Sequence, residues 1–163
     1  MRPLIAYFSE SALDNNLNVL KQKASDSQYC AVIKANAYGH RVENLIPILN
    51  RSVDYMAVAM REEADDIREK GGKLPILLLE GVFDKDEYQI ASRNNYMVAI
   101  GNEHQLEMLQ TTPLEKPIEV FVKVDTGMHR LGFTPERAPE IVLALEKLPS
   151  VASITLMTHF ATS

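Results

Sequence analysis

A lysine and a tyrosine lie four residues apart at the end of a short apolar segment, and their spacing could serve catalysis. The segment Cys30 to Ile33 is apolar, Lys34 follows it, and Tyr38 precedes Gly39. A lysine at the end of a buried strand costs free energy unless its charge is paired or its amine is used chemically. One interpretation is a Schiff-base lysine beside a tyrosine that binds a phosphate. The other is a strand end whose lysine reaches solvent, which the spacing alone favours.

A second candidate is the segment 119–125, in which polar and apolar residues alternate. In a strand, Val120, Val122 and Val124 would face one side, and the residues between them would face the other. An open sheet would turn that polar side to water, whereas a barrel wrapped by helices would enclose it. Lys123 would then lie inside the barrel, although by itself it is better explained by a salt bridge with a neighbouring carboxylate.

His159 ends another alternating segment, 152–159, and Arg130 follows a glycine turn. Taken separately, His159 would be a core histidine with satisfied hydrogen bonds, and Arg130 would be a surface arginine. Asp125 and Thr126 are best interpreted as residues that shape the turn after them.

Alternating strands and helices must position these residues. Short apolar segments predict six strands, over residues 30–34, 55–60, 75–80, 96–100, 119–125 and 152–159. Apolar residues at helical spacing predict helices over residues 11–24, 42–49, 61–70, 84–93, 102–109 and 135–148. Asp84 and Asn102 are expected to cap the fourth and fifth helices. Pro47 is expected to kink or shorten the second helix, and Thr134 with Pro135 to start the last.

The composition is that of an ordinary globular domain. The chain has 163 residues, of which 46% are hydrophobic and 24% charged, enough for one domain with a sizeable core. A net charge of −5 gives no indication of binding to nucleic acid or to an acidic membrane. The single cysteine, Cys30, excludes a disulfide framework, and no apolar segment is long enough to span a bilayer. With no signal peptide recognised, these features predict a cytoplasmic location.

Strands that alternate with helices predict an α/β fold with a parallel sheet and right-handed crossovers. An open doubly wound sheet would usually carry a glycine-rich phosphate turn, and the sequence contains no G-x-G-x-x-G. In a (β/α)8 barrel of the TIM type, functional residues lie at the carboxyl ends of strands, where the sequence places Lys34, Lys123 and His159. Six strands instead of eight predict an incomplete barrel over residues 10–163, preceded by a strand segment over residues 1–9.

Three motifs resemble the alanine racemase family, enzymes of fold type III that use pyridoxal phosphate. They are AVIKANAYGH at 31–40, VKVDTGMHRLGF at 122–133 and THFA at 158–161. Weaker similarity lies in AVAMREEADDIREKGG at 57–72 and PILLLEGVF at 75–83. Arg41 departs from the family pattern, which usually has a second glycine there. The family's last barrel strands and its C-terminal β domain have no counterpart in this sequence, so the resemblance implies a fragment of a longer enzyme.

The resemblance implies a role for each of five residues. Lys34 would hold pyridoxal phosphate through a Schiff base and move protons on one face of the substrate. Tyr38 would bind the cofactor phosphate, and Arg130 would contact the phenolic oxygen of the cofactor and the carboxylate of the substrate. Lys123 would be carbamylated and would orient Arg130. His159 would support a later arginine at the pyridine nitrogen.

The implied activity is the interconversion of L-alanine and D-alanine, which supplies D-alanine for peptidoglycan. The implied full-length enzyme is a cytoplasmic homodimer whose second base, a tyrosine, comes from the C-terminal domain of the partner subunit; no nucleic acid or membrane is implied. The present chain would be inactive alone. Two alternatives stay open. One is another fold-type-III enzyme, such as an amino-acid decarboxylase, against which DTGMHRLGF argues. The other is a non-catalytic pyridoxal-phosphate-binding barrel protein, against which the two missing strands argue.

Overall fold

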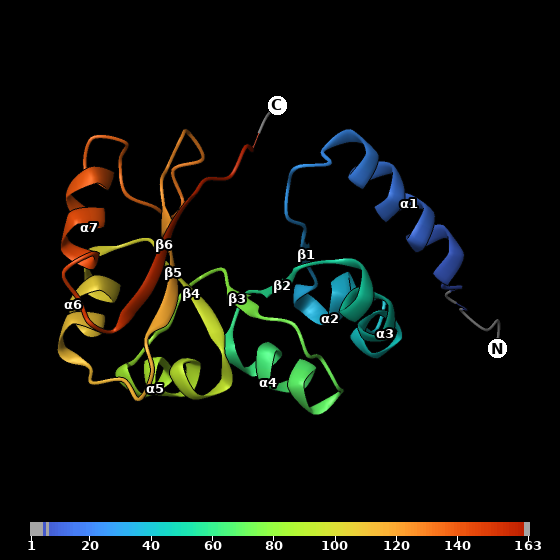
Figure 1. Cartoon of the computed structure of the whole chain (residues 1–163), viewed down its shortest axis with the longest axis horizontal. Coiled ribbons are helices and arrows are strands. Elements are labelled where there is room, and N and C mark those ends of the chain that lie inside the picture. Colours follow the sequence, from blue (N-terminus) through green and yellow to red (C-terminus); the bar gives the residue numbers. More distant parts are fainter. Residues whose placement is uncertain (1–4, 6, 162–163) are drawn as a thin grey trace.

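A single parallel sheet runs through the part of the chain that the computed structural model describes, Ile5 and residues 7–161 (Figure 1). Its six strands lie in the order of the sequence, and each pairs in parallel with the next. They are β1 (Cys30–Val32), β2 (Tyr55–Val58), β3 (Ile76–Leu78), β4 (Tyr96–Ile100), β5 (Ile118–Lys123) and β6 (Val151–Met157). The predicted α/β class is confirmed, and β1 and β6 form the two edges of the sheet.

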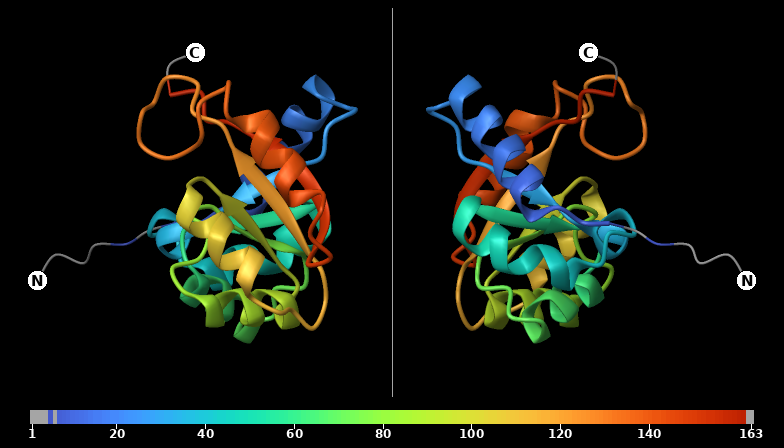
Figure 2. Two further views of the ribbon diagram at one scale, coloured as in Figure 1. Left: turned by 90° about the vertical axis from the view of Figure 1, so that its left-hand side faces the viewer. Right: turned by 90° about the vertical axis from the view of Figure 1, so that its right-hand side faces the viewer.

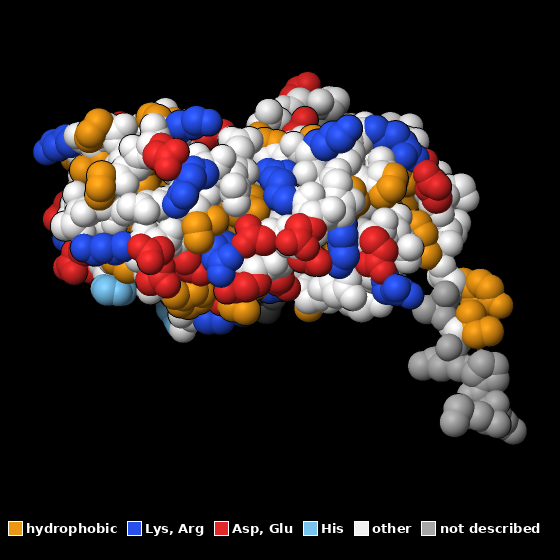
Figure 3. All heavy atoms as spheres, turned by 90° about the horizontal axis from the view of Figure 1, so that it is seen from below, with side chains coloured by type: hydrophobic (Ala, Val, Ile, Leu, Met, Phe, Trp, Pro, Cys, Tyr) orange, Lys and Arg blue, Asp and Glu red, His pale blue; other side chains and the backbone are white. Residues whose placement is uncertain are grey.

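Most of the helices lie along the outer side of this sheet, whereas the first packs against the third and the second is the turn that follows β1. The helices are α1 (Glu10–Lys23), α2 (Lys34–Tyr38), α3 (Val42–Ser52), α4 (Arg61–Glu69), α5 (Lys85–Asn94), α6 (Glu103–Thr111) and α7 (Ala138–Leu145). In Figure 1, α4 to α7 form an arc around the curved sheet. Seen from below, this outer side carries acidic and basic side chains next to one another (Figure 3); Arg61, for example, pairs with Glu62 and Glu87. The helices therefore separate one face of the sheet from solvent.

The two faces of the sheet carry separate apolar clusters. The larger cluster lies between sheet and helices, and its fully buried strand residues include Met56, Val58, Ile76, Leu78, Val98, Ile100, Val120 and Val122. The smaller cluster comprises Ala57, Leu77 and Met97, against which Phe121 and Met157 pack. In the described chain, helices cover one face and the other encloses side chains, as in a barrel rather than in a doubly wound sheet. The fold is an incomplete (β/α) barrel, as predicted.

β1 ends two residues earlier than the sequence predicts, and Lys34 lies on a turn rather than on a strand. β1 stops at Val32, and Lys34 begins α2. The backbone leaves the sheet there because Ile33 C=O accepts from Ala37 N–H at 2.9 Å, inside the turn. β2, β3, β5 and β6 also end two residues before their predicted ends. At each of these ends the chain leaves the ladder and forms a loop at the carboxyl edge of the sheet.

The sequence predicts that Pro47 kinks or shortens the second helix, and the predicted shortening is wrong. α3 continues through Pro47 to Ser52. A proline inside a helix removes one backbone hydrogen bond. Burial of Ile46, Ile48 and Leu49 around it offsets this loss.

The predicted start of the last helix is also wrong. α7 begins at Ala138, because Thr134 C=O accepts from Arg137 N–H at 3.0 Å and from Ala138 N–H at 3.1 Å and closes a turn over residues 135–137. Pro139, not Pro135, lies in the first turn of the helix, where its missing N–H removes no bond.

The N-terminal segment precedes α1. Ser9 caps this helix, and its Oγ accepts from Ala12 N–H at 3.2 Å. The strand expected over residues 1–9 falls mainly on residues outside the described chain. The described residues Ile5, Tyr7 and Phe8 belong to no strand.

Candidate active site

A cavity of about 810 Å³ lies along the inner side of the sheet and reaches from the start of β1 and β2 to the carboxyl ends of the strands. Its lining includes all five residues that the sequence singles out: Lys34, Tyr38, Lys123, Arg130 and His159. They come from three segments, namely the turn after β1, the end of β5 with its loop, and the segment after β6. A cavity of this size suits a small-molecule ligand. The structure therefore brings the five predicted residues to one site.

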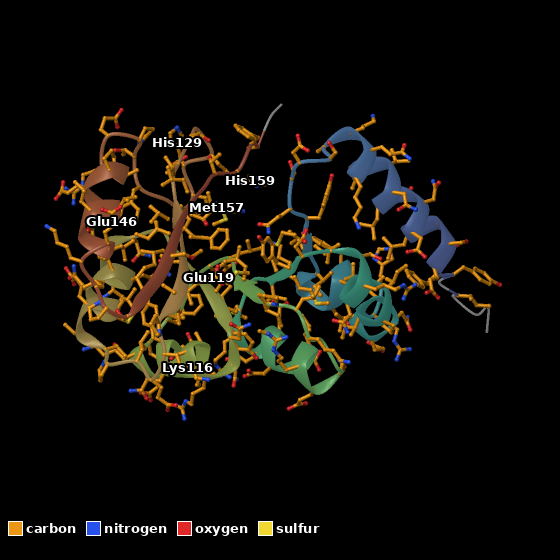
Figure 4. All side chains as sticks on the ribbon, viewed as in Figure 1. Lys116, Glu119, His129, Glu146, Met157 and His159 are labelled. Atoms are coloured by element: carbon orange, nitrogen blue, oxygen red, sulfur yellow. The ribbon has the colours of Figure 1, made fainter. Side chains whose placement is uncertain are left out.

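The loop of residues 124–133 and the segment after β6 lie at the same end of the barrel. His159 lies beyond the end of β6 in Figure 4, whereas Lys116, which precedes β5, lies at the opposite end. Figure 2 shows the loop 124–133, in orange, rising beyond the strands beside the C-terminal segment. The two are joined by the hydroxyls of Thr126 and Thr158, whose oxygens are 2.6 Å apart. This end is the functional end of a barrel.

The turn that carries Lys34 is left-handed. Residues 35–38 all have φ between 51° and 54°, although none of them is glycine. Each such residue costs roughly 1–2 kcal/mol, so the run persists only where its surroundings hold it. One such contact is Asn36 Oδ1, which accepts from Val42 N–H at 2.8 Å at the start of α3. Strain of this kind clusters at functional sites. In the sequence, small or turn-prone residues such as Asn36 and Gly39 indicated a turn, but not its left-handed conformation.

Lys123 and Arg130 bring two cationic groups to the same cavity. Burial lowers the pKa of Lys123, and the charge of Arg130 lowers it further, while Asp125 acts in the opposite direction. In the described structure Asp125 pairs with His129 rather than with Lys123, so the salt bridge considered from the sequence is not formed with it. Burial and the charge of Arg130 thus disfavour the ammonium form of Lys123 relative to that of a free lysine.

Asp125 shapes the loop 124–133 that presents Arg130, as the sequence predicts. Its Oδ1 accepts from Gly127 N–H at 2.9 Å and from His129 N–H at 3.0 Å. These two bonds lower the pKa of Asp125, so its carboxylate stays ionised. The side chain of Asp125 therefore stabilises the conformation of the loop 124–133.

Gly132 closes this loop against the end of β5. Phe133 N–H donates to Lys123 C=O at 2.9 Å, and Asp125 N–H donates to Phe133 C=O at 2.8 Å. At Gly132, where φ is 129°, a Cβ would lie 2.8 Å from Asp125 N and 3.0 Å from Val124 C. Backbone atoms cannot move aside as a flexible side chain can, so the close approach requires glycine.

We expect Gly132→Ala to destabilise the chain more than Gly127→Ala. The two glycines have φ of 129° and 131°, but a Cβ at Gly127 would meet no atom within 4 Å. Both variants carry the same backbone strain, and only Gly132→Ala adds a clash, worth about 2 kcal/mol. Urea unfolding of both variants measures the difference in the free energy of unfolding. Equal losses would show that the close approach at Gly132 does not contribute.

A buried amide that the sequence did not single out joins the ends of β3 and β4. Gln105 Oε1 accepts from Gly101 N–H at 2.9 Å, and Gln105 Nε2 donates to Glu80 C=O at 2.7 Å. Gly81 leaves room for this amide, because a Cβ there would lie 2.3 Å from Gln105 Nε2. The predicted cap is confirmed, since Asn102 Oδ1 accepts from Gln105 N–H at 2.9 Å. The side chain's contacts across the sheet had no local signal.

The family model described as alanine racemase, N-terminal domain, matches residues 8–163. The chain belongs to this family. The alanine racemase of Acidithiobacillus ferrooxidans is 42% identical over 163 residues, and that of Shewanella sp. (strain MR-4) is 45% identical over 157 residues. The crystal structure of the biosynthetic alanine racemase from Pseudomonas aeruginosa matches with a TM-score of 0.92 at 38% identity. The family inferred from the three sequence motifs is confirmed.

The chain spans less than half the length of these alanine racemases. The two curated relatives are matched over 99% and 96% of this chain but over 45% and 44% of their own length. The Pseudomonas aeruginosa structure is matched over 99% of this chain and 45% of its own. Among the residues described, no helix is long and apolar enough to cross a membrane. The alanine racemase family thus accounts for the barrel, while the roles of its five cavity residues stay predictions.

Proposed function

We propose that this chain supplies the pyridoxal-phosphate site of an alanine racemase. The observation that carries the proposal is that one cavity is lined by five residues of the family's motifs: Lys34, Tyr38, Lys123, Arg130 and His159. With a volume of about 810 Å³, the cavity has room for the cofactor together with alanine. When bound, pyridoxal phosphate acts as an electron sink that makes the α proton of an amino acid removable.

In this proposal Lys34 holds the cofactor through Nζ and exchanges the α proton on one face of the substrate. Its position at the start of a strained turn supports this role, because a fixed backbone limits where the amine points. Tyr38 ends the same turn and donates its hydroxyl to the cofactor phosphate. Its side chain is free to do so, since Tyr38 is 59% exposed.

Arg130 binds the carboxylate of alanine and the phenolic oxygen of the cofactor, for which a planar guanidinium is suited. Lys123 orients Arg130 after reacting with carbon dioxide: the neutral amine forms an N–C bond and releases a proton, and the carbamate product is an anion. The lowered pKa of Lys123 supports this step, because the neutral amine is more abundant at a given pH than in a free lysine. Two cations side by side in a partly buried site would otherwise repel each other.

The remaining parts of the proposal concern the whole protein. His159 supports an arginine that contacts the pyridine nitrogen, and a tyrosine from the C-terminal domain of a partner subunit returns the proton on the opposite face. The protein is a cytoplasmic homodimer in this proposal, and it supplies D-alanine for peptidoglycan.

The test is to purify the complete protein, add pyridoxal phosphate and follow D-alanine formation from L-alanine. D-alanine formation that depends on the cofactor supports the proposal. Cofactor binding without turnover would favour a non-catalytic pyridoxal-phosphate-binding barrel, and release of carbon dioxide from an amino acid would favour a decarboxylase.

The 163-residue chain alone should not racemise alanine at a rate near that of an intact enzyme. β1 and β6 each pair with only one strand in the described sheet, so the cavity is open to water between them. Loss of a second base and of a closed site each weakens catalysis, and we expect a rate at least about 10²-fold below that of an intact racemase. The measurement is D-alanine formation by this span with added cofactor, beside an intact alanine racemase. Comparable turnover would mean that the essential groups lie within these residues.

A further inference from the structure

The ladder between β1 and β2 stops one rung before the turn that carries Lys34. Val32 is paired with Ala57, and Ile33 N–H donates to Ala57 C=O at 2.8 Å. In a regular parallel ladder, the next rung would join Ala59 N–H to Ile33 C=O and Ala35 N–H to Ala59 C=O. The carbonyl groups of Ile33 and Ala59 accept other hydrogen bonds instead. The N–H groups of Ala35 and Ala59 therefore need other acceptors.

The hydrogen bonds that these two carbonyl groups accept show where the chain leaves the β1–β2 ladder. Ile33 C=O accepts from Ala37 N–H at 2.9 Å, within the left-handed turn. Ala59 C=O accepts from Glu80 N–H at 3.4 Å, on the side of β3. The turn can form only if something else satisfies the N–H groups of Ala35 and Ala59, because unpaired backbone donors are costly.

Glu63 on α4 satisfies both groups. Its Oε1 accepts from Ala35 N–H at 2.6 Å, and its Oε2 accepts from Ala59 N–H at 2.8 Å. Oε2 also lies 3.3 Å from Met60 N–H, at the cap of α4. We propose that Glu63 is a positioning residue: its carboxylate replaces the last rung between β1 and β2 and holds the turn from which Lys34 reaches the cavity. The part of this inference that concerns Lys34 chemistry rests on the proposed function.

The chemistry of the partners explains why the residue is a glutamate. Two N–H donors need two acceptor oxygens, which a carboxylate has and an amide lacks. The comparison with Gln105 supports this reasoning. Gln105 bridges an N–H donor of Gly101 and a C=O acceptor of Glu80, where an amide is the matching group. In each case a side chain from the first turn of a helix completes a gap at the carboxyl edge of the sheet.

The test compares Glu63→Gln with Glu62→Gln in the complete protein, by hydrogen exchange resolved to single amides. Glu63→Gln is nearly isosteric but replaces one acceptor by an NH2 group that faces a donor. We expect exchange at Ala35 or Ala59 to accelerate about tenfold or more. Glu62 is the matched control, because it is the neighbouring glutamate and its side chain is 62% exposed. Unchanged exchange at both amides in Glu63→Gln would overturn the proposal.

The variant Glu63→Asp tests the effect of side-chain length while the charge is kept. It keeps both oxygens but is shorter by one methylene group, so it should retain the bonds within its own loop, at Ala59, and lose the bond across to Ala35. Accelerated exchange at Ala35 with retained protection at Ala59 is the expected result. Retained protection at both amides would contradict the geometry given above.

The consequence for Lys34 is measured in the complete protein. Borohydride trapping of pyridoxal phosphate on Lys34 should be about tenfold slower in Glu63→Gln, because the turn loses a hydrogen bond that stabilises it. Trapping should be unchanged in Glu62→Gln. If exchange accelerates while trapping stays normal, Glu63 does not position Lys34, and the proposal is wrong on that point. If the unmodified complete protein traps no cofactor, the proposed function fails, and the exchange experiment still decides whether Glu63 holds the turn.

Discussion

Lys34→Ala in the complete protein is expected to reduce alanine racemisation by about 10³-fold or more. The variant removes the amine that anchors the cofactor and the group that exchanges the α proton, and acid–base catalysis alone is worth orders of magnitude in rate. Lys34 lies at the cavity, on a turn that the side chains of Asn36 and Glu63 stabilise. The measurement is the rate of D-alanine formation with saturating pyridoxal phosphate, together with peptide mapping after borohydride reduction.

Lys116→Ala is the control for this experiment. Lys116 is exposed and lies at the opposite end of the strands (Figure 4), so its removal should leave the rate unchanged. Peptide mapping of the unsubstituted protein should find the pyridoxyl label on Lys34. A label on Lys123, or no label on any lysine, would show that the assignment of Lys34 is wrong.

Lys123→Ala is expected to lower the rate by roughly 10²-fold, and small carboxylates such as acetate should restore part of it. The variant removes the amine that would become a carbamate, and with it the anion that orients Arg130. An added carboxylate has the same charge and can occupy the vacated space beside the guanidinium. Full activity of Lys123→Ala without any additive would end the carbamate proposal.

The pH dependence provides a second readout for Lys123. Burial and Arg130 lower the pKa of its amine, so the neutral form that reacts with carbon dioxide persists to lower pH than for a free lysine. Below that lowered pKa the amine is protonated, the carbamate is lost, and activity should fall. The acetate-rescued variant lacks this group, so the acid side of its pH profile should differ from that of the unsubstituted protein.

Locally encoded features were predicted well from the sequence. β4 has the predicted bounds, Tyr96–Ile100, because an apolar segment follows a left-handed cap at Asn95 and precedes a glycine. Asp84 and Asn102 cap α5 and α6 as expected, each through a bond to the N–H group three residues later. Such signals depend on neighbours in the sequence and survive in any fold that contains the element.

Features that depend on distant residues were not predicted. The left-handed turn over residues 35–38 contains no glycine, and it forms because Asn36 and Glu63 bind backbone groups in other segments. The cavity lining was named from family motifs, and the alternation along β5 indicated only which side Lys123 faces. The contact of Gln105 with Glu80 was likewise missed, because Glu80 lies 25 residues away in the sequence. A local pattern carries no information on which distant donor a side chain will meet.

The order of the strands in the sheet also has a consequence for how the chain acquires its structure during synthesis. Every strand pairs with the next strand in the sequence, and partners are separated by one helix with its loops, or by two between β1 and β2. Each new strand can therefore dock on the one made just before it, without waiting for a distant segment. The growing edge is always the most recent strand. In the described sheet β6 pairs only with β5, so its other edge offers unpaired backbone groups to any strand that reaches it.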